Sequence, residues 1–203
     1  MKDLVQKQLA QSIATMQAVL ADDSIANTMA TVGALTAQAM RSGHKLLVAG
    51  NGGSAADAQH LVAEFVVRLT VNRSALRAIA LTTDTSILTA CGNDFGFDTI
   101  FSRQIEALGQ PGDVFLGIST SGNSPNIANA LHQAKKQSII TIGFTGGTGG
   151  QMLSLCDHNI VIPSDVTMNI QESHLALEHI FCMIVERSTF GMDFDKQPQI
   201  LSE

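Results

Sequence analysis

The chain is organised around Leu47-Val48-Ala49-Gly50-Asn51-Gly52-Gly53-Ser54-Ala55-Ala56-Asp57-Ala58-Gln59-His60-Leu61-Val62-Ala63-Glu64-Phe65. This stretch begins in an apolar run that starts at Lys45, passes through a glycine-rich bend and continues as an alanine-rich run typical of a helix. Glycines let backbone N–H groups approach a ligand closely, and a helix start offers further unpaired N–H groups, which together attract an anion such as phosphate. The bend lacks the Gly-Lys-Ser/Thr of a Walker loop and does not read G-x-G-x-x-G.

His60 and Glu64 are four residues apart in this run, so a helix presents both side chains on one face. A phosphate-binding bend followed by a His/Glu pair favours a site for a phosphorylated small molecule. Each observation also has an ordinary explanation, because a glycine-rich turn is often only a tight connection and a His-x-x-x-Glu pair is usually a surface pair. The two together carry more weight because they share one helix and the end of one strand.

Length and composition predict a globular protein with a substantial apolar core, since the chain has 203 residues and is 45% hydrophobic. The formal net charge is −6 and the Lys and Arg residues are scattered, which argues against nucleic-acid binding. No apolar run is long enough to span a bilayer, and the chain start lacks a signal-peptide pattern, so no membrane partner is expected. Cys91, Cys156 and Cys182 lie in apolar contexts without C-x-x-C spacing, which predicts buried free thiols and a cytoplasmic protein.

Apolar and helical runs alternate along the chain after two initial helices, which are predicted over residues 3–21 and 25–43. The predicted strands are residues 45–49, 77–81, 113–118, 138–144 and 158–162. The later helices are predicted over residues 53–67, 84–91, 98–108, 125–136, 150–155 and 169–190. Because the strands are nearly all apolar, they suit a parallel sheet buried on both faces. We expect a three-layer α/β/α fold around a five-stranded parallel sheet, with the first two helices packed partly on another subunit.

Ligands of such sheets bind beyond the carboxyl ends of the strands, so the residues after the apolar runs are the candidates. After residues 113–118 comes Ser119-Thr120-Ser121-Gly122-Asn123-Ser124-Pro125, in which hydroxyls precede a helix that begins with proline. Hydroxyls at a helix start can hold a phosphate without a cation, and they can equally be simple helix caps. The glycine-rich segment 145–150 has neither a cation nor a hydroxyl cluster, and we interpret it as structural.

The last helix, predicted over residues 169–190, mixes polar with apolar residues. Asn169 with Glu172 three residues later indicates a capping box. The residues predicted to face inward are Leu175, Leu177, Ile180, Phe181, Ile184 and Val185. Four polar residues share one broad sector of the helix, namely Gln171, His174, Glu178 and His179. Helix geometry alone does not choose among them as site residues, and a solvated stripe is the ordinary alternative.

Taken in order, these motifs resemble those of the sedoheptulose-7-phosphate isomerases, or phosphoheptose isomerases, of the sugar-isomerase (SIS) domain superfamily. The matching motifs are Gly50-Asn51-Gly52-Gly53-Ser54, Asp57-Ala58-Gln59-His60 with Glu64, Gly92-Asn93-Asp94, Gly112-Asp113, Ile118-Ser119-Thr120-Ser121-Gly122-Asn123-Ser124, and Ile170-Gln171-Glu172 with His174 and His179. The resemblance extends to about Gly191. It implies a flavodoxin-like sheet in a single SIS domain over residues 1–203, with a helical extension at 1–43. It also implies a homotetramer with sites at subunit interfaces. Residues 191–203 have no periodic pattern, and we expect them to form a mobile tail.

The resemblance also implies the residues of the site. Those expected to bind the phosphosugar are Asn51, Gly52, Gly53, Ser54, Glu64, Asn93, Asp94, Ser119, Thr120, Ser121, Ser124 and Gln171. Those that match the zinc ligands of metal-carrying members are His60, Glu64, Gln171 and His179, so one Zn²⁺ per subunit is expected. Glu64 and His179 also match the acid/base catalysts. One departure is Asn169, since many relatives have a basic residue at that position.

The implied reaction converts sedoheptulose 7-phosphate to D-glycero-D-manno-heptose 7-phosphate, a precursor of bacterial surface glycans, by moving a proton between C1 and C2 through an enediolate. A carboxylate such as Glu64 can carry that proton, and an imidazole such as His179 can shuttle the hydroxyl proton. Zinc would stabilise the developing oxyanion as a Lewis acid. If Glu64 and His179 both bind zinc, they are less free to act as base and acid.

Two other functions stay open on the sequence alone. SIS domains also serve as non-catalytic phosphosugar sensors, and one relative binds a bacterial replication initiator. The presence of Glu64, Gln171 and His179 together favours the enzyme. The second alternative is an isomerase of another phosphosugar, such as arabinose 5-phosphate, against which the lack of an appended regulatory domain weighs.

Overall fold

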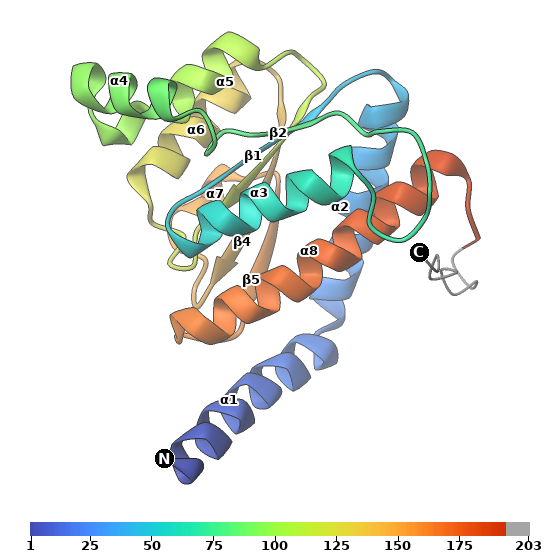
Figure 1. The fold of residues 1–203 in the computed structure, drawn as a ribbon, viewed down its shortest axis with the longest axis vertical. Helices are drawn as coiled ribbons and strands as arrows, with labels where there is room; N and C mark the ends of the chain where they lie inside the picture. Colours follow the sequence, from blue (N-terminus) through green and yellow to red (C-terminus); the bar gives the residue numbers. More distant parts are fainter. Residues whose placement is uncertain (194–203) are drawn as a thin grey trace.

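A single five-stranded sheet forms the centre of the computed structural model, which describes residues 1–193 (Figure 1). The strands are β1 Leu46–Gly50, β2 Ala78–Ala80, β3 Val114–Ile118, β4 Ile140–Gly146 and β5 His158–Ile162. All pairs are parallel and the order is β2-β1-β3-β4-β5, which is the order of the flavodoxin-like sheet that the resemblance implied. The expected mobile tail falls mainly on residues 194–203, which lie outside the described residues.

Helices cover both faces of the sheet, so the three-layer prediction is confirmed (Figure 1). The helices are α1 Lys2–Ala21, α2 Asp23–Arg41, α3 Gly53–Val66, α4 Thr85–Phe95, the 3₁₀ turn η1 Phe97–Thr99, α5 Ser102–Leu108, α6 Pro125–Lys136, α7 Met152–Leu155 and α8 Thr167–Phe190. One core lies between the sheet and α2, α3 and α8, and the other between the sheet and α4 to α7. Along β1, Leu46 and Val48 enter the first core while Leu47 and Ala49 enter the second, which explains the uninterrupted apolar runs.

Several predicted boundaries were wrong, each for a local reason. α4 continues through Gly92-Asn93-Asp94 to Phe95 and ends at Gly96, whose φ of 88° is not helical, while Asp84 caps its start by accepting from Ile87 N at 2.9 Å. β4 begins at Ile140 rather than 138, because Ser138 has a φ of 57° and ends the preceding turn. The helix predicted over residues 98–108 is divided into η1 and α5.

The capping box predicted at Asn169 is wrong. α8 begins at Thr167 after Val166, which offers no side-chain cap, and Asn169 is buried within the first turn. Its amide nitrogen lies 3.5 Å from Thr15 Oγ1 on α1. A buried position against α1 explains why a neutral amide is accommodated here.

The inward face predicted for α8 is also partly wrong. Leu175 and Ile180 are exposed, at 37% and 40% of their surface, whereas His174 and Glu178 are completely buried. α8 therefore buries a sector that contains ionisable side chains beside Leu177 and Phe181. The sum of hydrophobicity along the helix cannot locate this sector, since polar and apolar residues share it.

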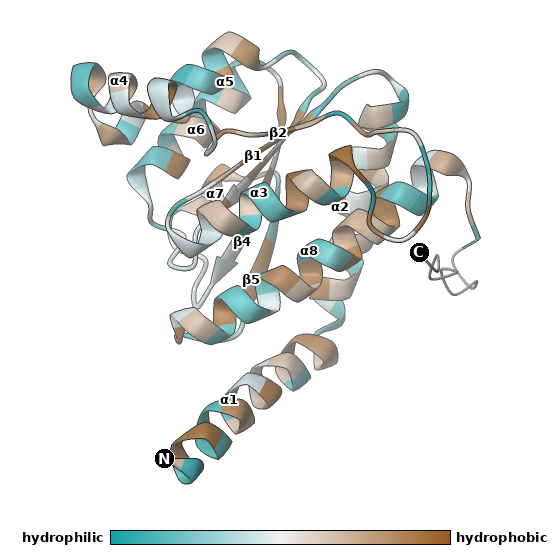
Figure 2. Cartoon of the chain, viewed as in Figure 1, coloured by the Kyte–Doolittle hydropathy of each residue, from teal (hydrophilic) through white to brown (hydrophobic). Residues whose placement is uncertain are grey.

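The N-terminal helix α1 extends away from the rest of the chain and carries apolar residues along its exposed surface (Figures 1 and 2). Thr15 is its one buried residue among the described residues. The large exposed apolar side chains are Leu4, Val5, Leu9, Ile13 and Leu20. Within one subunit these side chains have little to pack against, and an apolar stripe of this length usually marks a contact surface.

No helix within the described residues has the length and hydrophobicity needed to cross a membrane. The prediction for the cysteines is confirmed, because Cys91, Cys156 and Cys182 are all free and buried. Burial raises the pKa of both the Cys156 and the Cys182 thiol to about 12, with neighbouring carboxylates adding to the effect.

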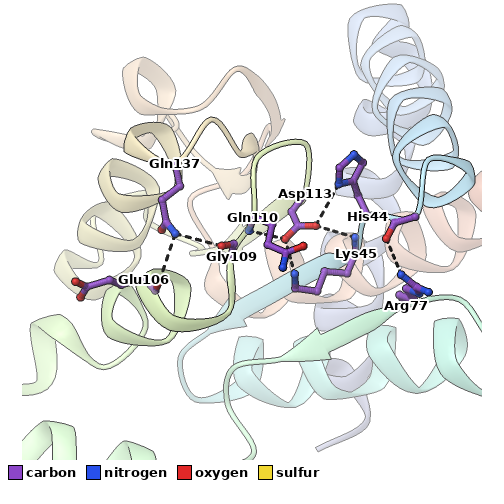
Figure 3. A network of polar contacts seen from close by, with 9 residues as sticks. His44, Lys45, Arg77, Glu106, Gly109, Gln110, Asp113 and Gln137 are labelled. Carbon is purple, nitrogen blue, oxygen red and sulfur yellow. Dashed lines mark hydrogen bonds and ion pairs between the residues drawn. The ribbon is translucent and has the colours of Figure 1, made fainter.

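The Gly112-Asp113 motif joins strands β1 and β3 where they begin, at the edge opposite their carboxyl ends (Figure 3). The buried Asp113 carboxylate accepts hydrogen bonds from Lys45 N at 3.0 Å, Lys45 Nζ at 2.6 Å and Gln110 N at 2.8 Å. Gly112 has a φ of 89°, and a Cβ there would lie 2.6 Å from the His44 ring. The motif is therefore needed to align two strands.

We predict that His174 makes the protein less stable as the pH falls from about 6.5 to about 4. Its Nε2 donates to Thr145 O at 3.0 Å, and burial lowers its pKa to about 4. Because the unfolded chain takes up this proton near pH 6.5 and the folded chain only near 4, the free energy of unfolding should drop by up to about 3 kcal/mol over that range. His174→Gln keeps a donor without a titrating group. The free energy of unfolding, measured with urea from pH 4 to 8, should depend less on pH for the variant than for the wild type. The same pH dependence in both proteins would contradict the prediction.

Candidate active site

The candidate site is built on α3 and α8, which lie side by side and run in the same direction (Figure 1). The residues that contact one another occur in the same order along both helices, as expected for parallel helices. The pairs are Gly53 with Gln171, His60 with His179, and Phe65 with Phe181. Residues more than one hundred positions apart are thus brought together, as the resemblance implied for His60 and His179.

His60, Glu64 and His179 form a cluster at the surface between the two helices. The Nε2 atoms of His60 and His179 are 2.8 Å apart, with the two rings edge-on at an interplanar angle of 85°. At that distance one Nε2 carries a hydrogen and the other accepts it. Glu64 Oε1 lies 3.7 Å from His60 Nε2, one helical turn further along α3. The His60 side chain is 43% exposed and that of Glu64 is 19% exposed, so a ligand can reach both.

Gln171 lies at the start of α8, against Gly53 at the start of α3. A Cβ on residue 53 would be 2.5 Å from Gln171 Nε2, so this position needs glycine for the amide to lie there. Gln171 precedes His179 by eight residues, which is about 12 Å along the helix axis. Among the described residues no hydrogen bond links Gln171 to the other expected zinc ligands.

Two carboxyl groups lie behind the histidine pair, one on each helix. Burial, with the charge of Asp57 adding to it, raises the pKa of Glu178 to about 8. Burial also raises the pKa of Asp57, and the nearby His60 opposes that shift. Asp57 Oδ2 and both carboxyl oxygens of Glu178 have no hydrogen-bond partner within the described residues. Such groups favour positive charge nearby.

The donor types of this cluster fit zinc. Two imidazoles and a carboxylate are common zinc ligands, the two Nε2 atoms already face each other, and the carboxyl groups behind them would be stabilised by a cation. Zinc is bound by imidazole nitrogens at about 2.0–2.1 Å, which places two such nitrogens about 3.3 Å apart in a tetrahedral site. At 2.8 Å the imidazoles are hydrogen-bonded to each other instead. In the described part of the chain no three His, Cys, Asp or Glu side chains have the arrangement of a metal site.

The loops at the carboxyl ends of β1 and β3 are tied together by polar contacts. The side-chain amides of Asn51 and Asn126 exchange two hydrogen bonds, at 2.9 and 2.8 Å. Ser119 Oγ and Ser124 Oγ are 2.9 Å apart, so the serine loop closes on itself. Asn126 was not singled out by the sequence, where its only signal is its place next to Pro125 at a helix start.

A cavity of about 260 Å³ lies at the carboxyl ends of the strands, beside the serine loop. Its lining residues are Thr120, Ser121, Gly146, Gly147, Thr148, Ser164, Asp165, Thr167 and Ile170. Segment 145–150, interpreted from sequence as structural, therefore also borders this cavity and supplies the hydroxyl of Thr148. A Cβ on Gly122 would overlap the backbone of Gly149, and one on Gly150 would lie 2.6 Å from Ser121 O, so neither position has room for a side chain.

Asn93 and Asp94 do not join the histidine cluster within one subunit. Both are exposed on α4, where Asn93 Nδ2 donates to Asp94 Oδ1 at 2.8 Å. Asp94 borders a different cavity, of about 330 Å³, between α4 and α5. In Figure 1, α4 lies at the far side of the sheet from α8.

Two further residues expected to bind the substrate, Gly52 and Ser54, lie at the start of α3. Ser54 is buried in the first turn of α3. Gly52 has a φ of 55° and a ψ of −119°, a conformation that favours glycine, and it borders a cavity of about 160 Å³ together with Asn51 and Thr82. The predicted bend is therefore a real backbone feature that exposes the start of α3.

The chain is similar to known proteins along almost all of its length. A family model described as the SIS domain matches residues 9–146. The phosphoheptose isomerase of Aneurinibacillus thermoaerophilus is 49% identical over 194 residues, which cover 96% of this chain and 98% of the relative. That of a Bradyrhizobium strain is 53% identical over 184 residues, 91% of this chain and 93% of the relative. The chain belongs to the phosphoheptose isomerase family.

A solved structure agrees with this assignment. The phosphoheptose isomerase of Neisseria gonorrhoeae is 40% identical and superposes with a TM-score of 0.86, over 91% of this chain and 98% of that one. Sugar-phosphate isomerisation is the activity of the family. The histidine cluster and the hydroxyl-lined cavity described above are the features of this member that bear on such chemistry.

We predict that Gly53→Ala displaces the Gln171 side chain without unfolding the protein. The added Cβ would be 2.5 Å from the end of a flexible side chain, which can move, so the free energy of unfolding should change by less than about 1 kcal/mol. If Gln171 contacts the substrate, the KM for a phosphosugar substrate should rise. Combining Gly53→Ala with Gln171→Ala should then give no further loss beyond Gln171→Ala alone, and additive effects would count against the contact.

Proposed function

We propose that this protein converts sedoheptulose 7-phosphate into D-glycero-D-manno-heptose 7-phosphate, an early step toward the heptose of bacterial surface glycans. The observation that carries this proposal is the cluster of His60, Glu64 and His179, which two distant helices bring to one accessible surface. It combines a carboxylate for proton transfer at carbon with an imidazole for proton transfer at oxygen.

In the proposed reaction, Glu64 takes the proton from one of C1 and C2 and returns it to the other. His179 passes the hydroxyl proton between O1 and O2, because a neutral imidazole both donates and accepts. His60 holds His179 in position through the 2.8 Å contact between their Nε2 atoms. Bound zinc would replace this hydrogen bond between the imidazoles; held by His60, Glu64, His179 and Gln171, it would supply a Lewis acid for the oxygen that becomes charged. Gln171 has to leave Gly53 to take part in that set.

The phosphate group is proposed to bind at the serine loop and the 260 Å³ cavity beside it. Ser119, Thr120, Ser121 and Ser124 supply hydroxyls, and α6, which begins at Pro125, adds the positive end of its dipole. No Lys or Arg lines this cavity in the described chain, which agrees with a neutral Asn169 in place of a basic residue. The sugar then extends from there toward α3 and α8.

We further propose that residues 1–203 form one SIS domain in the cytoplasm, a location supported by three free, buried thiols. The main alternative function is a phosphosugar-binding or initiator-binding module without catalysis. Such a module has no need for an accessible carboxylate beside two imidazoles, which is why we favour the enzyme.

Turnover of sedoheptulose 7-phosphate, with Glu64→Gln as the matched variant, tests the proposed function. Proton NMR should show a new aldose phosphate for the wild type, measured with and without added Zn²⁺. Glu64→Gln retains size and hydrogen bonding but removes the base, so kcat should fall by about 10²–10⁴-fold. Phosphosugar binding through the serine loop should largely persist.

Two results would count against this function. One is no product from the wild-type protein in either condition, which would leave the binding-module alternative. The other is full activity of a folded Glu64→Gln variant that still binds substrate. The same assay with arabinose 5-phosphate tests the second alternative, since turnover of that sugar alone would replace the proposed substrate.

We propose a homotetramer with sites at subunit interfaces. Support comes from the apolar surface of α1 and from the distance of Asn93 and Asp94 from the histidine cluster within one subunit. Light scattering should give four times the chain mass of 21.5 kDa. The double variant Leu9→Glu, Ile13→Glu places charge on the exposed face of α1 and should lower that mass. A monomeric wild-type protein would contradict the proposed tetramer. If the double variant kept the mass of the wild type, α1 would not form part of the subunit interface.

A further inference from the structure

The connection between α3 and β2 contains a buried ion pair that none of the expected site residues includes. Arg73, in this connection, and Glu186, on α8, have side chains that are 1% and 0% exposed. Arg73 Nε donates to Glu186 Oε1 at 2.8 Å, and Thr70 Oγ1 donates to Glu186 Oε2 at 2.6 Å. Both carboxylate oxygens of Glu186 are therefore satisfied, as a buried carboxylate requires.

The Nη atoms of Arg73 bind the end of α3, and Nη1 also donates to Ser74 O at 3.1 Å. Nη2 donates to the backbone carbonyl of Glu64 at 2.7 Å, and Nη1 donates to that of Phe65 at 2.7 Å. The last carbonyls of a helix lack partners within the helix and carry partial negative charge. A guanidinium is suited to this position because its planar donors can reach two carbonyls and a carboxylate at once.

We infer that Arg73, with Glu186, is a positioning residue that sets where Glu64 stands relative to His179. Arg73 is bound to the peptide carbonyl of Glu64 itself, and Glu186 follows His179 by seven residues, two turns along the same face of α8. The pair thus joins the turn of α3 that carries the proposed base to the helix that carries the proposed proton shuttle. This inference rests on the proposed function for its catalytic consequence.

Residues 67–77 follow an irregular path between α3 and β2. This connection turns back after α3, passes alongside α8 and returns to the sheet (Figure 1). Leu76 N donates to Phe65 O at 3.0 Å, the same carbonyl that accepts from Arg73. The connection therefore binds the last carbonyls of α3 through three donors, from Arg73 and Leu76.

Arg73→Met tests the inference against Lys45→Met as a matched control. Both variants remove a cation from a carboxylate that is buried, but among the described residues Lys45 and Asp113 have no hydrogen bond or ion pair to α3 or α8. Activity is measured at a temperature at which circular dichroism shows that both variants are fully folded. Arg73→Met should lower kcat by about 10- to 100-fold with KM within about twofold, because a small misplacement of a reacting group has that effect. Lys45→Met should keep the wild-type kcat.

Arg73→Lys is the variant to use if Arg73→Met does not fold. It keeps a cation for Glu186 but cannot donate to both carbonyls and the carboxylate, so kcat should be intermediate. Equal kcat values for the Arg73→Met or Arg73→Lys variant and the Lys45→Met control would overturn the inference. So would an effect confined to KM.

Hydrogen exchange gives a second readout that does not depend on activity. The amides of the last turn of α3, residues 64–67, should exchange at least tenfold faster in Arg73→Met, or in Arg73→Lys, and unchanged in Lys45→Met. If the wild-type protein has no isomerase activity, the proposed function fails while this measurement still tests the positioning of Glu64. Unchanged exchange in the Arg73 variants would overturn the positioning role whatever the activity.

Discussion

α3 and α8 pack in parallel along the length of the shorter helix, and the candidate site depends on this contact. It is stabilised at three levels. A glycine at the start of α3 makes room for the Gln171 amide. Near the end of α3, Phe65 packs on Phe181 with the ring centroids 5.8 Å apart, and beyond it the Arg73–Glu186 pair joins the connection after α3 to α8. Removing one partner of a buried ion pair usually costs about 3–5 kcal/mol, since it leaves an uncompensated charge. The relative position of the helices is therefore strongly determined, and with it the distance between His60 and His179.

The same contact buries charge next to the site. Glu178 has no hydrogen-bond partner in the described part of the chain, and its pKa is raised to about 8 because ionisation would put a charge into the core beside Asp57. Below that pH the folded protein keeps it neutral. An isolated structural core would gain stability from an apolar residue here. A carboxyl group in this place is understandable if the neighbouring cluster binds a cation or handles protons, since functional sites commonly reduce stability.

The phosphate side of the site follows a different principle, in which glycines bring backbones close together. Gly122 and Gly149 touch without side chains between them, so the loops after β3 and β4 form one wall. The Asn51–Asn126 pair then attaches the loop after β1 to the start of α6. Because these loops are all at the carboxyl edge of a rigid parallel sheet, their hydroxyl and N–H groups are held in place before any ligand arrives.

The sequence was sufficient for features that depend on neighbours in the chain. Apolar runs long enough for a strand identified all five strands, and the rule that ligands bind at the carboxyl edge pointed to the loops at Gly52 and Ser119. The spacing of His60 and Glu64 placed them on one face, since helix geometry is local. The sequence motifs also led to the family. The boundary of α4 was less certain, because Gly92 does not end this helix, which continues through Asn93 and Asp94 to Gly96.

Tertiary structure decided everything that depends on which face of α8 is buried. Gln171, His174, Glu178 and His179 share one sector by periodicity, yet His174 and Glu178 are buried while His179 meets His60. The sequence predicts that Asn169 caps a helix, but in the structure its side chain is buried next to Thr15 of α1. Arg73 and Glu186 are 113 residues apart, and no pattern in the sequence connects them. The physical reason is common to all of these cases. Local periodicity describes one helix at a time, whereas burial and pairing are set by the neighbours that a helix meets only after the chain has folded.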